Sequence, residues 1–293
     1  SDGTTAIVGA YGEDGVNDAN SGQGAAYIFT KTNGEWDIGR KIVATDGQGS
    51  DLFGYSVSIS SDGTTAIVGA YGEDEKATDA GAAYIFTKTN GTWDTGTKIV
   101  ASDGQQTDRF GFSVSISSDG TTAIVGAYLE DEKANAAGAA YIFTKTNGTW
   151  DTGTKIVASD GQTQDYFGYS VSISGDGTTA IVGAWGEDDT YDYQGAAYIF
   201  TKSGGMWDTG TKIVATDGQT QDYFGRSVSI SSDGTTAIVG AYGEDDTYSF
   251  QGAAYIFTKS GGMWDTGTKI VATDGQQDDY FGISVSISGD GTT

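Results

Sequence analysis

The chain has 293 residues, of which 37% are hydrophobic and 12% aromatic, so it has enough apolar material for a packed core. It contains no His and no Cys, which excludes disulfides, thiolate metal sites and the Ser-His-Asp and Cys-His types of catalysis. The formal net charge of −25 disfavours nucleic acids and anionic membranes as partners, and no apolar run approaches the ~20 residues of a membrane span.

A short corner, Ser-Asp-Gly-Thr-Thr or Gly-Asp-Gly-Thr-Thr, recurs along the whole chain. It divides the sequence into repeats 1–60, 61–117, 118–174, 175–231 and 232–288, with a partial repeat at 289–293. Regular repeats of this kind are typical of folds in which each unit buries its apolar face against its neighbours. We therefore expect residues 1–293 to form a single domain built from repeats.

Each repeat predicts four short strands, which the second copy illustrates in chain order. Residues 65–71 form a nearly continuous apolar run, as in a strand covered on both faces, and residues 82–87 are rich in aromatic and branched side chains. A third strand is expected at 98–101, and in 113–117 serines alternate with Val and Ile at a period of two. No segment shows the spacing of an amphipathic helix.

Four antiparallel strands per repeat are typical of a propeller blade, so the predicted fold is an all-β propeller of five four-stranded blades. The serine-rich strand would be innermost, and the Gly-Ala pair that ends the second strand would let neighbouring blades approach closely. The last inner strand, at 284–288, could then complete the first blade beside residues 4–8. Residues 289–293 duplicate residues 1–5, however, which also suits a segment of a longer array.

Three features of each repeat resemble a known family. Phe53-Gly54, Gly69-Ala70 and the run 81–86 (Gly-Ala-Ala-Tyr-Ile-Phe) look like the FG-GAP repeat of integrin α-subunit propellers. The Ser-Asp-Gly-Thr-Thr corner and the Asn-Gly-Thr-Trp turn are more similar to the calcium-free bacterial type. The resemblance implies a β-propeller, extracellular or at the cell surface, that serves adhesion or ligand binding. The Pro of the Gly-Ala-Pro motif is replaced by Tyr or Trp in every repeat.

The calcium site of integrin-type repeats is not expected here. That site lies in a loop between the first two strands, where this chain has only the short corner with one carboxylate, such as Asp62. Calcium takes six to eight oxygen ligands, so one carboxylate is too few. We interpret Asp62 as a turn former and predict no metal and no cofactor.

An acidic loop follows the second strand of every repeat. Its candidate binding residues are Glu73, Asp74, Glu130, Asp131, Glu187, Asp188, Glu244 and Asp245. Clustered carboxylates can bind divalent cations or a basic partner, and the alternative is a solvated rim that keeps the protein soluble. A glycosidase needs one specific carboxylate pair, and equivalent loops in all repeats argue against such a unique site.

Aromatic side chains accompany these loops in the fourth and fifth repeats, at Tyr191, Tyr193 and Tyr248. Exposed rings beside acids suit sugars and cationic ligands. Asn90 and Asn147 match the N-glycosylation acceptor pattern, although the turn itself also favours Asn-Gly. One tryptophan of each repeat, at position 36, 93, 150, 207 or 264, is expected to pack between outer strands.

These features predict a non-enzymatic adhesion or scaffold module, extracellular or at the cell surface, that binds a protein or glycan partner. Two alternatives stay open. The chain could be the structural unit of a self-assembling extracellular polymer, or it could be a glycan-binding lectin that uses the tyrosine-rich loops.

Overall fold

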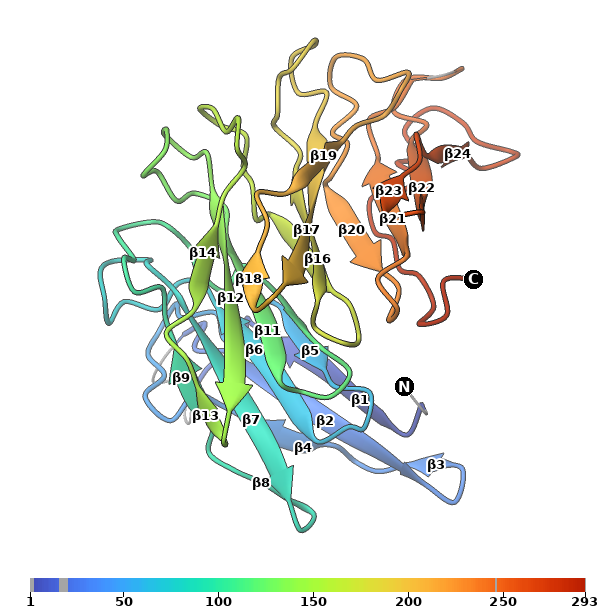
Figure 1. Ribbon diagram of the computed structural model, residues 1–293. Helices are drawn as coiled ribbons and strands as arrows, with labels where there is room; N and C mark the ends of the chain where they lie inside the picture. Colours follow the sequence, from blue (N-terminus) through green and yellow to red (C-terminus); the bar gives the residue numbers. More distant parts are fainter. Residues whose placement is uncertain (1–2, 16–20, 246, 293) are drawn as a thin grey trace. The chain divides into compact units, whose positions relative to one another are not determined.

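The computed structural model describes residues 3–15, 21–245 and 247–292 (Figure 1). All regular structure in these ranges is β-strand, with elements β1 to β24. The described ranges contain no helix, and therefore none with the length and apolarity needed to cross a membrane. The predicted all-β class is confirmed.

The strands fall into types that recur once per repeat. The inner strands are β5 (Val57–Ile59), β10 (Ser113–Ile116), β15 (Ser170–Ile173) and β20 (Ser227–Ile230). The second strands are β1 (Thr5–Ala10), β6 (Thr65–Ala70), β11 (Thr122–Ala127), β16 (Thr179–Ala184) and β21 (Thr236–Ala241). The third strands are β2 (Ala25–Thr32), β7 (Ala82–Thr89), β12 (Ala139–Thr146), β17 (Ala196–Ser203) and β22 (Ala253–Ser260).

Two short strands share the outermost position of each sheet. The first set is β3 (Glu35–Trp36), β8 (Thr92–Trp93), β13 (Thr149–Trp150), β18 (Met206–Trp207) and β23 (Met263–Trp264). The second set is β4 (Arg40–Ile42), β9 (Thr97–Ile99), β14 (Thr154–Ile156), β19 (Thr211–Ile213) and β24 (Thr268–Ile270).

The sheets are antiparallel, in the order inner, second, third and outer strand, and each inner strand comes from the end of the preceding repeat. The first sheet, β1 to β4, has no inner strand. In the fourth sheet, β15 pairs with β16 (Val171 opposite Val182) and β16 pairs with β17 (Ala180 opposite Phe200). Five sheets for five repeats confirm the predicted blade count. We expected four strands per sheet, but the outermost one is split in two, because both β18 and β19 pair with β17.

The split in the outer strand has a local cause. In the fourth repeat the Asp208 carboxylate accepts hydrogen bonds from the backbone N–H groups of Thr201, at 3.1 Å, and Gly210, at 3.0 Å. Without this carboxylate, the Thr201 N–H would donate its hydrogen bond to the neighbouring strand. A side chain therefore takes the place of one ladder partner and interrupts the outer strand after Trp207.

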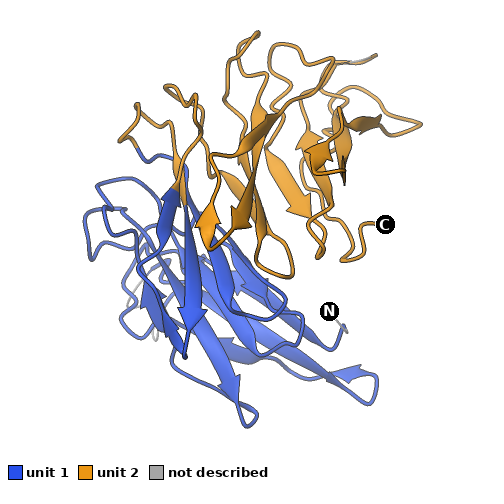
Figure 2. Cartoon of the chain, in the orientation of Figure 1, with its two compact units in different colours: residues 1–130, 141–155 blue, residues 131–140, 156–293 orange. Residues whose placement is uncertain are grey.

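The chain forms two compact units, each with its own core (Figure 2). Unit 1 comprises residues 1–130 and 141–155, and unit 2 comprises residues 131–140 and 156–293. The sheets of the first two repeats lie in unit 1, and those of the fourth and fifth in unit 2. The expectation of a single domain stays a prediction.

The Phe of each Phe-Gly pair anchors the core between sheets. In unit 2, Phe224 is fully buried and its ring lies edge-on to Tyr255, at 5.5 Å between centroids, and to Phe257, at 6.0 Å. The glycine that follows lies so close to the preceding sheet that a Cβ on Gly183 would be 1.9 Å from the Gly225 carbonyl oxygen. The predicted close approach at the Gly-Ala strand end is confirmed.

The hairpin corner is built as expected from its Asp-Gly pair. Gly63 has a φ of 64°, which an L-residue with a side chain rarely adopts. The Asp62 carboxylate accepts hydrogen bonds from the Ser60 hydroxyl, at 2.6 Å, and from the backbone N–H of Thr64, at 3.0 Å. Asp62 is therefore a turn former, as predicted.

One predicted strand is wrong. Residues 285–288 belong to no strand, although Ile287 donates its N–H to the Ser229 hydroxyl of β20 at 3.3 Å. In other repeats this segment pairs with a following Thr-Ala-Ile-Val-Gly-Ala strand, and the sequence has no sixth copy of that strand. The expectation that residues 284–288 complete the first sheet beside residues 4–8 stays a prediction.

Candidate functional site

The acidic loops contain two kinds of carboxylate. The second residue of each loop, such as Asp74, Asp131, Asp188 and Asp245, is exposed, as a solvated rim predicts. The first residue is buried in the second to fifth repeats: Glu73 is 4% exposed, Glu130 and Glu187 are 2%, and Glu244 is 1%. Glu13 of the first repeat is partly exposed. A tight turn directs this glutamate inward, because its backbone N–H bonds to the carbonyl three residues earlier, as from Glu187 to Ala184 at 3.2 Å.

Each buried glutamate pairs with a lysine from the outer strand of its own repeat. In unit 2, Lys212 Nζ lies 2.7 Å from Glu187 and 2.9 Å from Asp160, a residue of the preceding repeat. Lys269 lies 2.6 Å from Glu244 and 2.9 Å from Asp217 in the same way. The repeats are thus joined by an ion-pair network around a buried glutamate, which the sequence pattern did not reveal.

A tyrosine completes this network. The Tyr198 hydroxyl donates to Asp160 at 2.8 Å, and Tyr255 donates to Asp217 at 2.8 Å. Burial raises the pKa of Glu187, and the Lys212 ammonium opposes this rise. Burial also opposes ionisation of Lys212, but its hydrogen bonds to Glu187 and Asp160 outweigh that effect and raise its pKa. The Lys212 ammonium thus favours the ionised form of Glu187 against the effect of burial.

Carboxylates that could hold a cation converge in unit 1, but a lysine occupies their centre. Oxygens of Asp46, Glu73 and Glu75 lie within 4.8 Å of one another. Lys98 Nζ contacts all three, at 2.8, 2.7 and 2.5 Å. The ammonium group supplies the positive charge that a metal ion would bring. Together with Asp62, whose carboxylate is used in its own turn, this arrangement does not fit the calcium site of integrin-type repeats.

A second buried carboxylate lies two residues before each core Phe, and our reading of the sequence missed it. Asp51, Asp165 and Asp222 are 3%, 1% and 1% exposed. One oxygen of Asp222 accepts the Gln219 N–H at 2.7 Å, and the other has no partner. Burial, and secondarily the charge of Glu244, raises the pKa of Asp222 to about 7. Asp51 and Asp165 have pKa values raised to about 6 for the same reason.

The predicted aromatic candidates separate into packed and exposed rings. Tyr193 is partly buried and stacks on Trp185, at 6.0 Å between centroids and 21° between planes. Tyr191 and Tyr248 are 47% and 51% exposed, so these two are available to a partner. Arg226 places its guanidinium 4.2 Å from the centre of the Tyr169 ring, which adds a cation–π contact to the packed cluster.

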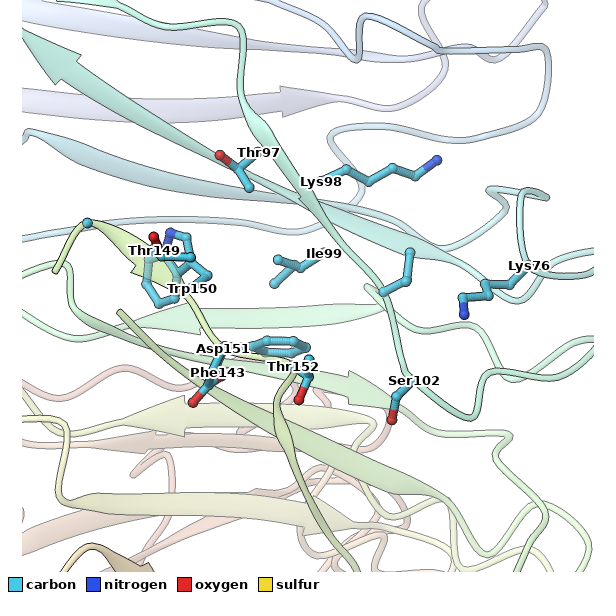
Figure 3. A pocket seen from close by; sticks show the side chains of 12 residues that line it. Lys76, Thr97, Lys98, Ile99, Ser102, Phe143, Thr149, Trp150, Asp151 and Thr152 are labelled. Atoms are coloured by element: carbon cyan, nitrogen blue, oxygen red, sulfur yellow. The ribbon is translucent and has the colours of Figure 1, made fainter. Parts of the chain in front are cut away.

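The link tryptophans line grooves along the outer strands. In unit 1 a groove of about 500 Å³ lies between β9 and the β12–β13 turn, with Ile99 on one side and Trp150 and Phe143 on the other (Figure 3). In unit 2 a groove of about 460 Å³ has the corresponding residues Ile213, Trp264 and Phe257. Trp93 is 5% exposed, as predicted for core packing, whereas Trp36 is 48% exposed and Trp150 and Trp264 are partly exposed.

The two candidate glycosylation residues lie on exposed turns. Asn90 and Asn147 both have a φ of 51°, and both side chains are exposed. The turn therefore needs an Asn-Gly pair for its own geometry, and the position is also accessible to modification.

Comparisons with known proteins cover most of the repeat array. A family model described as "FG-GAP repeat" matches residues 36–86, 93–143, 150–200, 207–257 and 264–292. E3 SUMO-protein ligase RanBP2 of Homo sapiens is 27% identical over 158 residues, which is 53% of this chain and 5% of that protein. The Pan troglodytes protein of the same name is 26% identical over the same shares.

Among solved structures, hydrazine synthase of Kuenenia stuttgartiensis is similar at a TM-score of 0.49 and 13% identity. The match covers 86% of this chain and 60% of that one. The two RanBP2 proteins are much longer than this chain, which spans about one twentieth of their length.

Proposed function

This chain belongs to the FG-GAP repeat family, and from that premise we propose that it is a non-enzymatic adhesion or scaffold module, extracellular or at the cell surface, that binds a protein or glycan partner. The observation that carries the proposal is the recurrence of one groove. The grooves beside Trp150 and Trp264 have similar volumes and corresponding residues. Equivalent sites in different repeats suit a repetitive or multivalent partner, whereas catalysis needs one distinct set of residues.

The acidic network supports the same proposal. The glutamates that might have served as catalytic acids or metal ligands are buried and paired with lysines, as Glu187 is with Lys212. What stays accessible on the loops are the exposed aspartates and the rings of Tyr191 and Tyr248. Such a surface offers hydrogen-bond acceptors and aromatic faces, which are groups for recognition.

The test is binding of the purified chain to arrays of extracellular matrix proteins and glycans, with Trp150→Ala and Trp264→Ala combined as the groove variant. Trp36→Ala is the matched control, because Trp36 is the equivalent residue of the first repeat and is 48% exposed. We expect the groove variant to lose binding and the control to keep it. A hydrolase activity that disappears when one carboxylate pair is replaced would overturn the proposal.

A second candidate function is self-assembly into an extracellular polymer. It is favoured by the near-identical repeats, because a surface that recurs along one chain can contact the same surface of another chain. Light scattering should then show assemblies. Discrete monomers of the unmodified chain at high concentration would contradict this candidate.

A further inference from the structure

Two repeats carry residues that the repeat fold itself does not require. The loop before the third strand has Tyr and Gln three positions apart in the fourth repeat (Tyr191 and Gln194) and in the fifth (Tyr248 and Gln251). The second and third repeats have alanines at the corresponding positions, namely Ala77, Ala80, Ala134 and Ala137. The first repeat has a glutamine at the position of Gln194, Gln23, whose Nε2 donates to the Gly47 carbonyl at 3.0 Å. Since the sheets of the second and third repeats form with alanines, the tyrosine and the glutamine are not required for the sheet to fold.

In the fourth repeat these residues line a groove of their own. It has a volume of about 560 Å³ and is lined by Tyr191, Gln194, Asp189, Thr216, Asp217 and Gln219, together with short neighbouring residues. Tyr191 presents a ring that is 47% exposed, while Gln194 is only 6% exposed. The groove therefore combines one aromatic face with side chains that are almost all polar.

The amide of Gln194 is the unusual group in this groove. Its oxygen is buried and accepts no hydrogen bond, and Gln251 of the fifth repeat shows the same feature. A buried polar atom without a partner costs stability, which the alanines of other repeats avoid. The opposite wall is shaped around this side chain, because a Cβ on Gly218 would lie 2.7 Å from the Gln194 Nε2.

The loop is held in place before any ligand arrives. The Gln194 N–H bonds to the Tyr191 carbonyl at 3.1 Å, and the Tyr193 N–H bonds to the Asp188 carboxylate at 2.6 Å. The Tyr193 carbonyl in turn accepts the N–H of Tyr223, at 3.1 Å. A groove whose walls are fixed in this way loses little conformational entropy on binding.

We propose that the groove at Tyr191–Gln194 binds neutral saccharides, and that the corresponding pair of the fifth repeat, Tyr248 and Gln251, does the same. This inference rests on the proposed function as a binding module and names its ligand class. The tyrosine ring packs against the C–H face of a pyranose, and the glutamine oxygen accepts a hydrogen bond from a sugar hydroxyl. The exposed Asp189 carboxylate accepts a further hydrogen bond from a sugar hydroxyl and disfavours anionic ligands such as uronic acids and sulfated sugars, whereas both Asp217 oxygens are already used by Tyr255 and Lys269.

The experiment measures affinity by isothermal titration calorimetry with neutral oligosaccharides of four to six glucose, galactose or mannose units. The test variant replaces Tyr191, Gln194, Tyr248 and Gln251 by Ala, the residue that other repeats carry there, so the fold is retained. We expect at least one oligosaccharide to bind the unmodified chain and to bind the variant at least about tenfold more weakly. Tyr11→Ala removes another exposed ring, 51% accessible, outside these grooves and should bind normally.

Two results would overturn the inference. One is the absence of binding to every neutral oligosaccharide, and the other is unchanged affinity in the fourfold variant. These failures differ from a failure of the proposed function. If the fourfold variant still binds a matrix protein through the tryptophan grooves, the binding module stands and only the saccharide site is refuted.

Discussion

Replacing Asp222 by Asn should stabilise this protein at pH 8, although it removes a charged residue from the repeat. Asp222 is 1% exposed, and only one of its oxygens has a hydrogen-bond donor, the Gln219 N–H at 2.7 Å. Burial raises its pKa from 3.8 to about 7. An asparagine keeps the acceptor for Gln219 and is neutral at every pH.

The sign follows from proton linkage. The folded state binds the Asp222 proton more tightly than the unfolded state, so its contribution to stability is complete below pH 4 and is lost as the pH rises through about 7. A rise of about three pKa units at about 1.4 kcal/mol each means that ionisation of buried Asp222 lowers the free energy of unfolding by at most about 4 kcal/mol. Relaxation of the surroundings lowers this value, and we expect Asp222→Asn to gain about 2 kcal/mol at pH 8, less than about 1 kcal/mol at pH 5, and little below pH 4.

The assay is urea denaturation of both proteins between pH 5 and pH 8, followed by circular dichroism. Asp233→Asn is the control with the opposite sign, because hydrogen bonds from Ser231 and Thr235 lower the pKa of Asp233. The control should be destabilised at pH 8. If Asp222→Asn has the same effect on the free energy of unfolding at pH 5 and at pH 8, the buried carboxylate is not protonated as we describe and the reasoning fails.

Two further predictions concern the contacts that join the repeats. Lys212→Met leaves Glu187 buried without its cation and should cost about 3–5 kcal/mol of unfolding free energy, measured by denaturant titration. The control is Lys202→Met, which changes a partly exposed lysine over a tryptophan ring and should cost less than about 1 kcal/mol. Equal effects would contradict the network. Gly183→Ala places a Cβ 1.9 Å from a carbonyl oxygen and should lower the melting temperature, measured by calorimetry, by more than about 10 °C. The control Gly12→Ala adds a Cβ that meets nothing within 4 Å and should leave the melting temperature unchanged.

Much of the architecture could be predicted because it is specified by short stretches of sequence. The Asp-Gly pair at Asp62 fixes a corner through its own backbone and side-chain hydrogen bonds, and the alternation of Val114 and Ile116 with serines fixes the faces of an inner strand. These signals recur in each repeat, so one correct interpretation applies throughout the chain. The segment 284–288 shows the limit, since a strand also needs a partner and this segment has no following copy of the second strand.

The candidate site depended on contacts between repeats, which no local pattern contains. Glu187 and Asp188 are adjacent acidic residues in the sequence, but one is buried against Lys212 and the other is exposed. In the sequence, Asp222 is one loop aspartate among many. Only the packing around it buries its carboxyl group and thereby raises its pKa. The sequence alone therefore determined the strands, the turns and the number of sheets, because these follow from local backbone chemistry. Only the tertiary structure decided which carboxylates are buried and which aromatic rings stay exposed to solvent, because burial depends on which neighbouring segment packs against them.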